Sequence, residues 1–356
     1  MRRPRPAYQP AGVFFFLGYE QFLVFSSQSL TRREHLASHS REECCSMSTP
    51  TKKPGTAAGK RSRLYWGVPA ALGGLVLVVL IARWLMGLPA VASFVADYPG
   101  HSELPAAAPV GFPAWLAWQH FLNAFFLLLI IRTGWQVRTT TRPSGHWTRN
   151  NKGLIKTKNP PTKITLELWF HLTLDALWIL NGLVFAVLLF ASGQWMRIVP
   201  TSWDVFPNAL SAALQYASLD WPTENGWINY NALQLLTYFV TVFIAAPLAF
   251  ITGLRMSGAW PKKAASLNKA FPIEWARAVH FPVMIYFVAF IVVHVFLVLA
   301  TGALRNLNHM YGVQDNDGWL GFWVFLASVV VMVAAWFLAR PLFLRPVASL
   351  MGKVSR

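Results

Sequence analysis

Six apolar segments, each long enough to cross a lipid bilayer, constrain the fold of this chain more than any other feature. A helix needs about 20 apolar residues to span a hydrocarbon core about 30 Å thick. Hydrophobic residues make up 55% of the 356 residues and charged residues 13%, a composition typical of a polytopic membrane protein rather than a soluble domain. The sequence therefore predicts an all-α transmembrane fold of six helices, with spans at residues 64–88, 113–134, 164–191, 232–254, 277–301 and 319–340.

The formal net charge of +17 follows the predicted topology. Lysine and arginine concentrate before the first span, in the loops 135–163 and 255–276, and in the tail, whereas the intervening loops are mostly acidic. Basic loops stay in the cytoplasm under the positive-inside rule, so both termini are expected there. The charge thus predicts membrane topology, not nucleic-acid binding.

The first 63 residues form a predicted disordered, basic leader. Its apolar run at residues 13–16 is too short to span a membrane or to act as a signal sequence. Met47 begins a small, basic segment, and we expect translation to start there. Because Cys44 and Cys45 precede Met47, disulfides, thiolate sites and iron–sulfur clusters are not expected.

Four histidines lie inside or at the ends of the predicted spans, namely His120, His171, His280 and His294. The last two are fourteen residues apart on one predicted helix, which places them about 21 Å apart along its axis and on one face. That helix can offer a ligand to each of two haems stacked across the bilayer. The spacing is typical of a membrane cytochrome b.

The predicted topology sorts these histidines into two pairs by depth. His120 and His294 fall in the outer half of the membrane, and His171 and His280 fall in the inner half. A neutral imidazole is a good iron ligand, whereas an unpartnered polar group in hydrocarbon costs several kcal/mol. The alternative is that these histidines form interhelical hydrogen bonds or lie at the interface.

The sequence resembles the di-haem cytochrome b subunits of bacterial respiratory complexes, including those of hydrogenases and formate dehydrogenases. The resemblance rests on WQHFLNAFFLLLIIRTG and HFPVMIYFVAFIVVH and covers a four-helix haem-binding core at 113–301. Residues 64–112 would add an extra helix and an outer loop, and residues 302–356 a sixth span and a cytoplasmic tail. In this family one ligand comes from each of the first two core helices and two from the fourth, which matches the four histidines.

The resemblance implies two b haems and a bound quinone in a bacterial plasma membrane protein. Such a subunit is not itself catalytic: it passes electrons between menaquinone or ubiquinone and a catalytic oxidoreductase subunit of the molybdenum-enzyme or hydrogenase type. Two rivals share the membrane fold, a haem-free transporter or channel and a cytochrome that reduces a substrate at an exposed haem edge. A membrane metalloenzyme is disfavoured because no His-Glu-x-x-His or dense histidine cluster occurs.

Three polar residues near these histidines are candidate cofactor contacts. Asp175 lies one turn beyond His171 and could accept a hydrogen bond from a ligand imidazole, protonate a quinone, or bond to a neighbouring helix. Arg277 could pair with a haem propionate or extend to the membrane interface. Asn123 is a weaker candidate near the outer haem.

Regions outside the spans carry less specific signals. We interpret the remaining histidines, His35, His39, His101, His146 and His309, as solvated or interfacial. The aromatic loop 192–231 is expected along the outer surface, with a short helix near 208–219. The basic loop 135–163 is either a docking surface or a solvated loop. Pro247 and Pro282 should loosen their helices locally.

Overall fold

The computed structural model describes residues 58–151, 160–221, 225–261 and 263–356. The chain divides into two units, Met1–Ser62 and Arg63–Arg356, and the elements described below belong to the second, apart from the first residues of α1. The predicted start at Met47, both cysteines, His35 and His39 lie outside the described residues.

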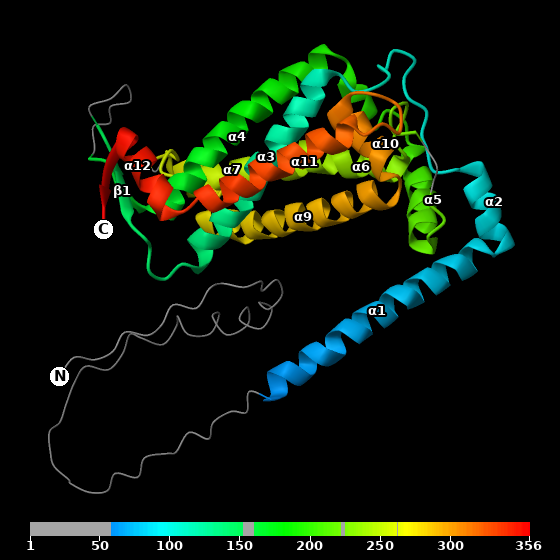
Figure 1. The fold of residues 1–356 in the computed structure, drawn as a ribbon, viewed down its shortest axis with the longest axis horizontal. Coiled ribbons are helices and arrows are strands. Elements are labelled where there is room, and N and C mark those ends of the chain that lie inside the picture. The colour runs from blue at the N-terminus through cyan, green and yellow to red at the C-terminus, as the bar shows by residue number, and fades with distance from the viewer. Residues whose placement is uncertain (1–57, 152–159, 222–224, 262) are drawn as a thin grey trace, which may run out of the picture. The chain divides into compact units, whose positions relative to one another are not determined.

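Six helices in the described residues are long and apolar enough to cross a membrane, which confirms the predicted all-α transmembrane fold (Figure 1). Each overlaps one predicted span, and the ends differ by a few residues. Five of these spans lie within single helices. They are α1 (Ala58–Met86), α3 (Ala114–Thr139), α4 (Leu166–Ala191), α9 (Ile273–Ala300) and α11 (Leu320–Leu338). The sixth, Ala232–Met256, combines α6 (Ala232–Phe239), η2 (Val240–Ala245) and α7 (Ala246–Met256).

The composite helix changes winding where the sequence contains a proline. Pro247 has no amide hydrogen and cannot complete the regular hydrogen-bond ladder. The π-helix η2 ends at Ala245, two residues before Pro247, as expected where a helix absorbs such a break. Pro282, in contrast, lies inside α9, which continues as an α-helix on both sides of it.

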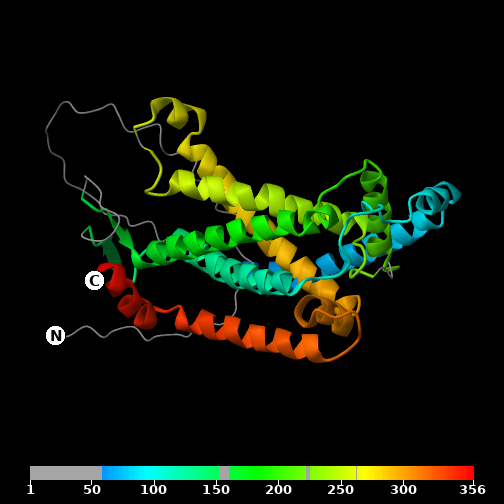
Figure 2. The ribbon, with the colours of Figure 1, turned by 90° about the horizontal axis from the view of Figure 1, so that it is seen from above.

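Two antiparallel pairs of helices form the centre of the bundle, α3 with α4 and α7 with α9 (Figures 1 and 2). Leu129 of α3 and Leu174 of α4 are buried together with Ala339, which follows α11. Ala245, Val283 and Phe287 form a second buried group between the composite helix and α9. Many other apolar side chains of the spans are exposed, as expected for helices that face lipid tails.

At one end of the bundle, called here the sheet end, the chain forms a three-stranded antiparallel sheet. Strand β1 (His146–Arg149) pairs with β2 (Lys163–Thr165) on one side and with β3 (Gly352–Ser355) on the other. Helix α12 (Pro341–Met351) leads into β3. The loop 135–163 is therefore not simply solvated, because its residues 146–149 and Lys163 take part in a sheet with the C-terminal strand.

The opposite end, called here the loop end, carries short helices between the spans. These are α5 (Val205–Ser218), η1 (Gln194–Arg197), α10 (Ala303–Leu307) and η3 (Asn308–Gly312). Helix α5 confirms the short helix expected near 208–219. Two further short helices are α2 (Pro89–Asp97) and α8 (Ala265–Ala270).

Candidate functional site

Two of the four histidines lie near the sheet end, and a threonine of a neighbouring helix holds each of them. The Nδ1 atom of His171 in α4 lies 2.9 Å from Oγ1 of Thr133 in α3. The Nδ1 atom of His280 in α9 lies 2.8 Å from Oγ1 of Thr252 in α7. The helix pairs that carry them also pack together, because Leu127 and Ile131 of α3 lie against the buried group of Ala245, Val283 and Phe287.

The threonine contacts determine which histidine nitrogen carries the proton. Thr133 Oγ1 lies 2.8 Å from the carbonyl oxygen of Leu129, and Thr252 Oγ1 lies 2.5 Å from that of Leu248. A carbonyl oxygen can only accept, so each hydroxyl proton is donated within the helix. Each hydroxyl must then accept a hydrogen bond from Nδ1–H of the histidine. This arrangement leaves Nε2 unprotonated, with its lone pair available to a metal.

A glycine follows each of these threonines and faces the same histidine. A Cβ atom at Gly134 would lie 3.2 Å from Cε1 of His171, and one at Gly253 would lie 3.4 Å from Cε1 of His280. Glycine thus leaves room for the imidazole close to the helix backbone. Each sheet-end histidine therefore contacts a Thr-Gly dipeptide of the neighbouring helix, Thr133-Gly134 for His171 and Thr252-Gly253 for His280.

The other two histidines face each other near the loop end. The ring centres of His120 in α3 and His294 in α9 are 6.1 Å apart. Imidazole nitrogens bind first-row metals at about 2 Å, and a ring centre lies roughly 1 Å further away, so two rings that share one metal have centres about 6 Å apart. Nδ1 of His120 is buried without a hydrogen-bond partner among the described residues. The donor set and the spacing fit a bis-histidine metal centre.

Comparison with known proteins identifies the family. The profile described as prokaryotic cytochrome b561, of the nickel-hydrogenase cytochrome b type, matches residues 111–313, which is more than half of the chain. The chain belongs to the prokaryotic cytochrome b561 family. No curated protein and no solved structure gives a significant match. The matched region contains all four histidines.

Membership of this family establishes the broad role. The cytochrome is a multi-pass bacterial membrane protein that binds haem b and transfers electrons. The family also implies contact with lipid and with a catalytic partner. The haem-free transporter or channel weighed as an alternative does not agree with this assignment.

Asp175 lies beside one candidate ligand of the cytochrome. Its Oδ2 atom is 3.6 Å from Nε2 of His171, which is longer than a hydrogen bond. Nε2 is the nitrogen that the Thr133 contact leaves available. A metal bound there would require the carboxylate to turn aside.

The other two predicted cofactor contacts, Arg277 and Asn123, lie in different surroundings. The side chain of Arg277 is exposed in the first turns of α9. Asn123 donates to the carbonyl oxygen of Gln119 at 2.9 Å and accepts from Nε1 of Trp178 at 3.0 Å. The Gln119 contact lies within α3 and the Trp178 contact joins α3 to α4, so both ends of the amide are occupied. Asn123 stays a predicted contact near the outer haem.

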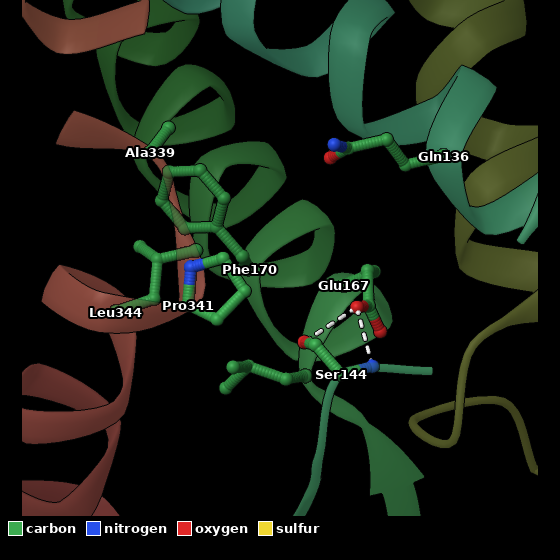
Figure 3. Close-up of a pocket in the computed structure, with 8 residues that line it drawn as sticks. Gln136, Ser144, Glu167, Phe170, Ala339, Pro341 and Leu344 are labelled. Carbon is green, nitrogen blue, oxygen red and sulfur yellow. Dashed lines mark hydrogen bonds between the residues drawn. The ribbon is translucent and has the colours of Figure 1, made fainter. Parts of the chain in front are cut away.

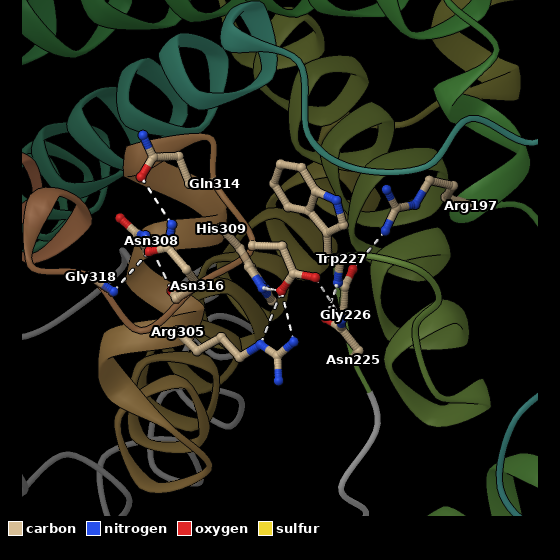
Figure 4. Close-up of polar contacts among 11 residues, drawn as sticks. Arg197, Asn225, Gly226, Trp227, Arg305, Asn308, His309, Gln314, Asn316 and Gly318 are labelled. Carbon is tan, nitrogen blue, oxygen red and sulfur yellow. Dashed lines mark hydrogen bonds and ion pairs between the residues drawn. The ribbon is translucent and has the colours of Figure 1, made fainter.

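His309 corrects one sequence-based interpretation, because this side chain is buried and not solvated. Its Nε2 atom lies 2.8 Å from Oδ1 of Asp315, which also accepts two hydrogen bonds from Arg305. Asn225 donates to the other carboxylate oxygen at 2.9 Å (Figure 4). His101 is exposed as expected, while His146 is half-buried in β1.

These contacts shift the proton affinities of two groups outside the spans. Hydrogen bonds from Asn225, His309 and Arg305 lower the pKa of Asp315 to about 2. Burial lowers the pKa of His309, although its hydrogen bond to Asp315 opposes that shift. The Asp315 cluster, defined as Asn225, Arg305, His309 and Asp315, thus joins the loop before α6 to the loop before α11.

Arg197 is the largest fully buried side chain in the described residues, with 1% of its surface exposed. It donates to the carbonyl oxygens of Gly111 at 2.7 Å and Gly226 at 2.6 Å, and its guanidinium lies over the rings of Phe112 and Tyr230. These contacts compensate its charge without a carboxylate. Arg197 lies in the aromatic loop 192–231, and nothing in its local sequence indicates burial.

A small pocket of about 40 Å³ lies at the sheet end. Gln136 of α3, Glu167 and Phe170 of α4, and Ala339 and Pro341 at the α11–α12 junction contribute to its walls (Figure 3). Its volume suffices for only a few water molecules. In this conformation it does not provide room for a quinone ring.

Proposed function

We propose that the cytochrome holds two b haems, one between His120 and His294 and the other between His171 and His280. Two imidazoles would hold each haem iron, and the bound group would supply one-electron transfer rather than substrate binding. The chain's own contribution is to fix the imidazoles, to exclude water from them and to set their basicity.

The observation that carries this proposal is the pairing of the four imidazoles. One pair has a ring separation of 6.1 Å. The other pair presents two Nε2 lone pairs, because Thr133 and Thr252 hold the Nδ1 atoms. One helix, α9, supplies a member of each pair, which supports two centres at different depths.

The finer assignments complete the proposal. The chain would act as a non-catalytic electron-transfer subunit between menaquinone or ubiquinone and a hydrogenase or molybdenum-enzyme type subunit. Both termini would lie in the cytoplasm, as the basic loops indicate. Asp175 and Arg277 remain candidate cofactor contacts. Asp175 would contact a quinone, because Thr133 and the metal would occupy both nitrogens of His171. Arg277 would contact a haem propionate.

Haem quantitation tests the proposal directly. We expect about two b haems per purified chain by pyridine haemochrome assay, with a low-spin reduced-minus-oxidised spectrum. His294→Ala should remove one haem and His280→Ala the other, because each substitution deletes one axial ligand. The two variants should lose different spectral components in a redox titration.

His101→Ala provides the matched control, since His101 is an exposed histidine of the same chain. It should retain both haems. A single haem per chain in the parent protein, or a full haem content in His280→Ala, would contradict the two-centre arrangement. Reduction by hydrogenase or formate dehydrogenase type partners, with menaquinol and ubiquinol compared as alternative donors, would then identify the electron carriers.

A further inference from the structure

The guanidinium group of Arg197 carries a positive charge that no acidic side chain neutralises. It is 1% exposed, and its two terminal nitrogens donate to the carbonyl oxygens of Gly111 and Gly226 (Figure 4). Its Nε atom is buried without a hydrogen-bond partner, and Arg197 forms no ion pair in the part of the chain that the structure describes. Carbonyl dipoles solvate this charge but do not cancel it.

The charge of Arg197 persists at neutral pH. Burial lowers its pKa, but the usual pKa of an arginine is about 12.5 or higher, and guanidinium groups in proteins stay protonated. A charge enclosed by protein is screened much less by salt than a charge at the surface. The field of Arg197 therefore extends into the neighbouring part of the bundle.

Asp315 belongs to the same loop-end network but does not neutralise Arg197. Asn225, the residue before Gly226, donates to Asp315 at 2.9 Å (Figure 4). Arg305 balances this carboxylate, with its Nη2 atom 2.9 Å from Oδ1. Because this ion pair has no net charge, it leaves the charge of Arg197 in place.

Aromatic rings connect this charge to the loop-end histidine pair. The Cζ atom of Arg197 lies 5.0 Å from the ring centre of Tyr230. The ring of Tyr230 meets that of Tyr238 at 5.0 Å, and the ring of Tyr238 meets that of His294 at 6.1 Å, both edge to face. Two tyrosine rings thus separate the guanidinium group from a proposed ligand of the loop-end haem.

The backbone around Arg197 also leads to the other loop-end histidine. Phe112, whose ring centre lies 4.8 Å from the Cζ atom of Arg197, is buried two residues before α3, the helix that carries His120. Arg197 therefore lies at the end of the bundle where His120 and His294 face each other. Along α9, the sheet-end histidine His280 is about 21 Å further away.

The reduction of a haem iron by one electron lowers the charge of its site by one. A fixed positive charge nearby therefore stabilises the reduced state and raises the reduction potential. A unit charge about 12 Å away, at an effective dielectric constant of about 20, changes the equilibrium constant for reduction roughly tenfold. An exposed arginine has a smaller effect because solvent and salt screen it.

We propose that the buried charge of Arg197 raises the reduction potential of the loop-end haem. Arg197 does this through its field, without touching His120 or His294. The inference rests on the two-haem arrangement proposed above. The sheet-end haem, which lies deeper in the bundle, is affected little.

Potentiometric titration of the full chain, purified with its haems, tests this role. The loop-end haem is identified by the spectral component that His294→Ala removes. Arg197→Gln and Arg197→Met delete the charge, and in both the equilibrium constant for reduction of the loop-end haem should fall roughly tenfold, with less than a twofold change at the sheet end. Arg197→Lys keeps the charge and should retain most of the parent potential. The methionine variant is included because an apolar side chain often replaces a buried charge without loss of stability.

Arg83→Gln is the matched control, because Arg83 is exposed and also donates to a backbone carbonyl oxygen, that of Ser218 at 3.0 Å. It should leave both potentials unchanged. An unchanged loop-end potential in Arg197→Gln, or equal falls in Arg197→Gln and Arg197→Lys, would overturn the role of the charge. Loss of the loop-end haem from all three Arg197 variants would do the same, since it would assign Arg197 a structural role. Fewer than two haems in the parent chain would instead overturn the two-haem arrangement together with this inference.

Discussion

At the sheet end, a threonine hydroxyl holds each histidine by a hydrogen bond, whereas at the loop end aromatic rings surround the histidines. His294 stacks on Phe290 with ring centres 5.4 Å apart, and His120 meets the edge of Tyr311 at 5.6 Å. A hydrogen bond donated by Nδ1–H makes an imidazole a more basic ligand, and aromatic contacts do not. One protein thus offers two chemically different environments to the same type of ligand.

This difference has a consequence for redox chemistry. A more basic axial ligand stabilises the oxidised iron and lowers the reduction potential. If other influences are equal, the haem proposed at the sheet end should have the lower potential. Electrons would then move more easily from the sheet end to the loop end than in the reverse direction.

Removing the threonine hydroxyls should change the difference in haem affinity and reduction potential between the two ends most. Thr133→Val or Thr252→Val keeps the side-chain volume but deletes the acceptor for Nδ1–H. We expect haem affinity at the sheet end to fall about 10- to 100-fold and the potential of that haem to rise. Haem titration of the apoprotein and a spectroelectrochemical titration would measure both effects.

Thr173→Val is the control for these variants, because the hydroxyl of Thr173 donates only to its own helix, at the carbonyl oxygen of Trp169. It should leave both potentials unchanged. If Thr133→Val changed the two haems equally, the hydrogen bond would not explain the contrast between the two ends.

A smaller effect is expected from the Asp315 cluster at the loop end. Asp315→Asn should lower the midpoint of thermal unfolding by roughly one to three degrees at neutral pH, since Arg305 loses a partly exposed ionic partner. It should leave the sheet-end haem unaffected. Asp317→Asn, an exposed neighbouring carboxylate, should change the midpoint little.

The carboxylate of Asp315 should make the stability of the folded chain fall at low pH. The pKa of Asp315 in the folded chain is about 2, below the usual value of about 3.9. Its contribution to stability is therefore complete only well above the unfolded pKa, begins to fall near about pH 5 and is lost as the pH falls through about 2. Thermal unfolding between pH 5 and 2 should show this loss in the parent chain, and Asp315→Asn should show less of it.

The smallest effect should come from Tyr311→Phe, which keeps the ring beside His120 and removes only the hydroxyl. We expect less than a twofold change in haem affinity at the loop end, because ring contact and not hydrogen bonding restrains this imidazole. Tyr311→Ala should weaken binding further. A large loss in Tyr311→Phe would show that the hydroxyl contributes to the loop-end site.

The sequence by itself determined the membrane fold, because span length and charge are local properties of the chain. All six predicted spans correspond to helices, and α5 lies where a short helix was expected. The fourteen-residue interval between His280 and His294 also follows from helix geometry alone. Such periodic features need no knowledge of which helices are neighbours.

Only the tertiary structure decided which side chains meet across helices. Sequence reasoning interpreted His309 as solvated or interfacial, whereas folding buries it against Asp315. The roles of Thr133 and Thr252 also depend on the contact of α3 with α4 and of α7 with α9. Likewise, the pairing of β1 with β3 joins segments about 200 residues apart. Hydrogen bonds and ring contacts act over a few ångströms, so their partners are fixed by packing between distant segments and not by the local pattern of residues.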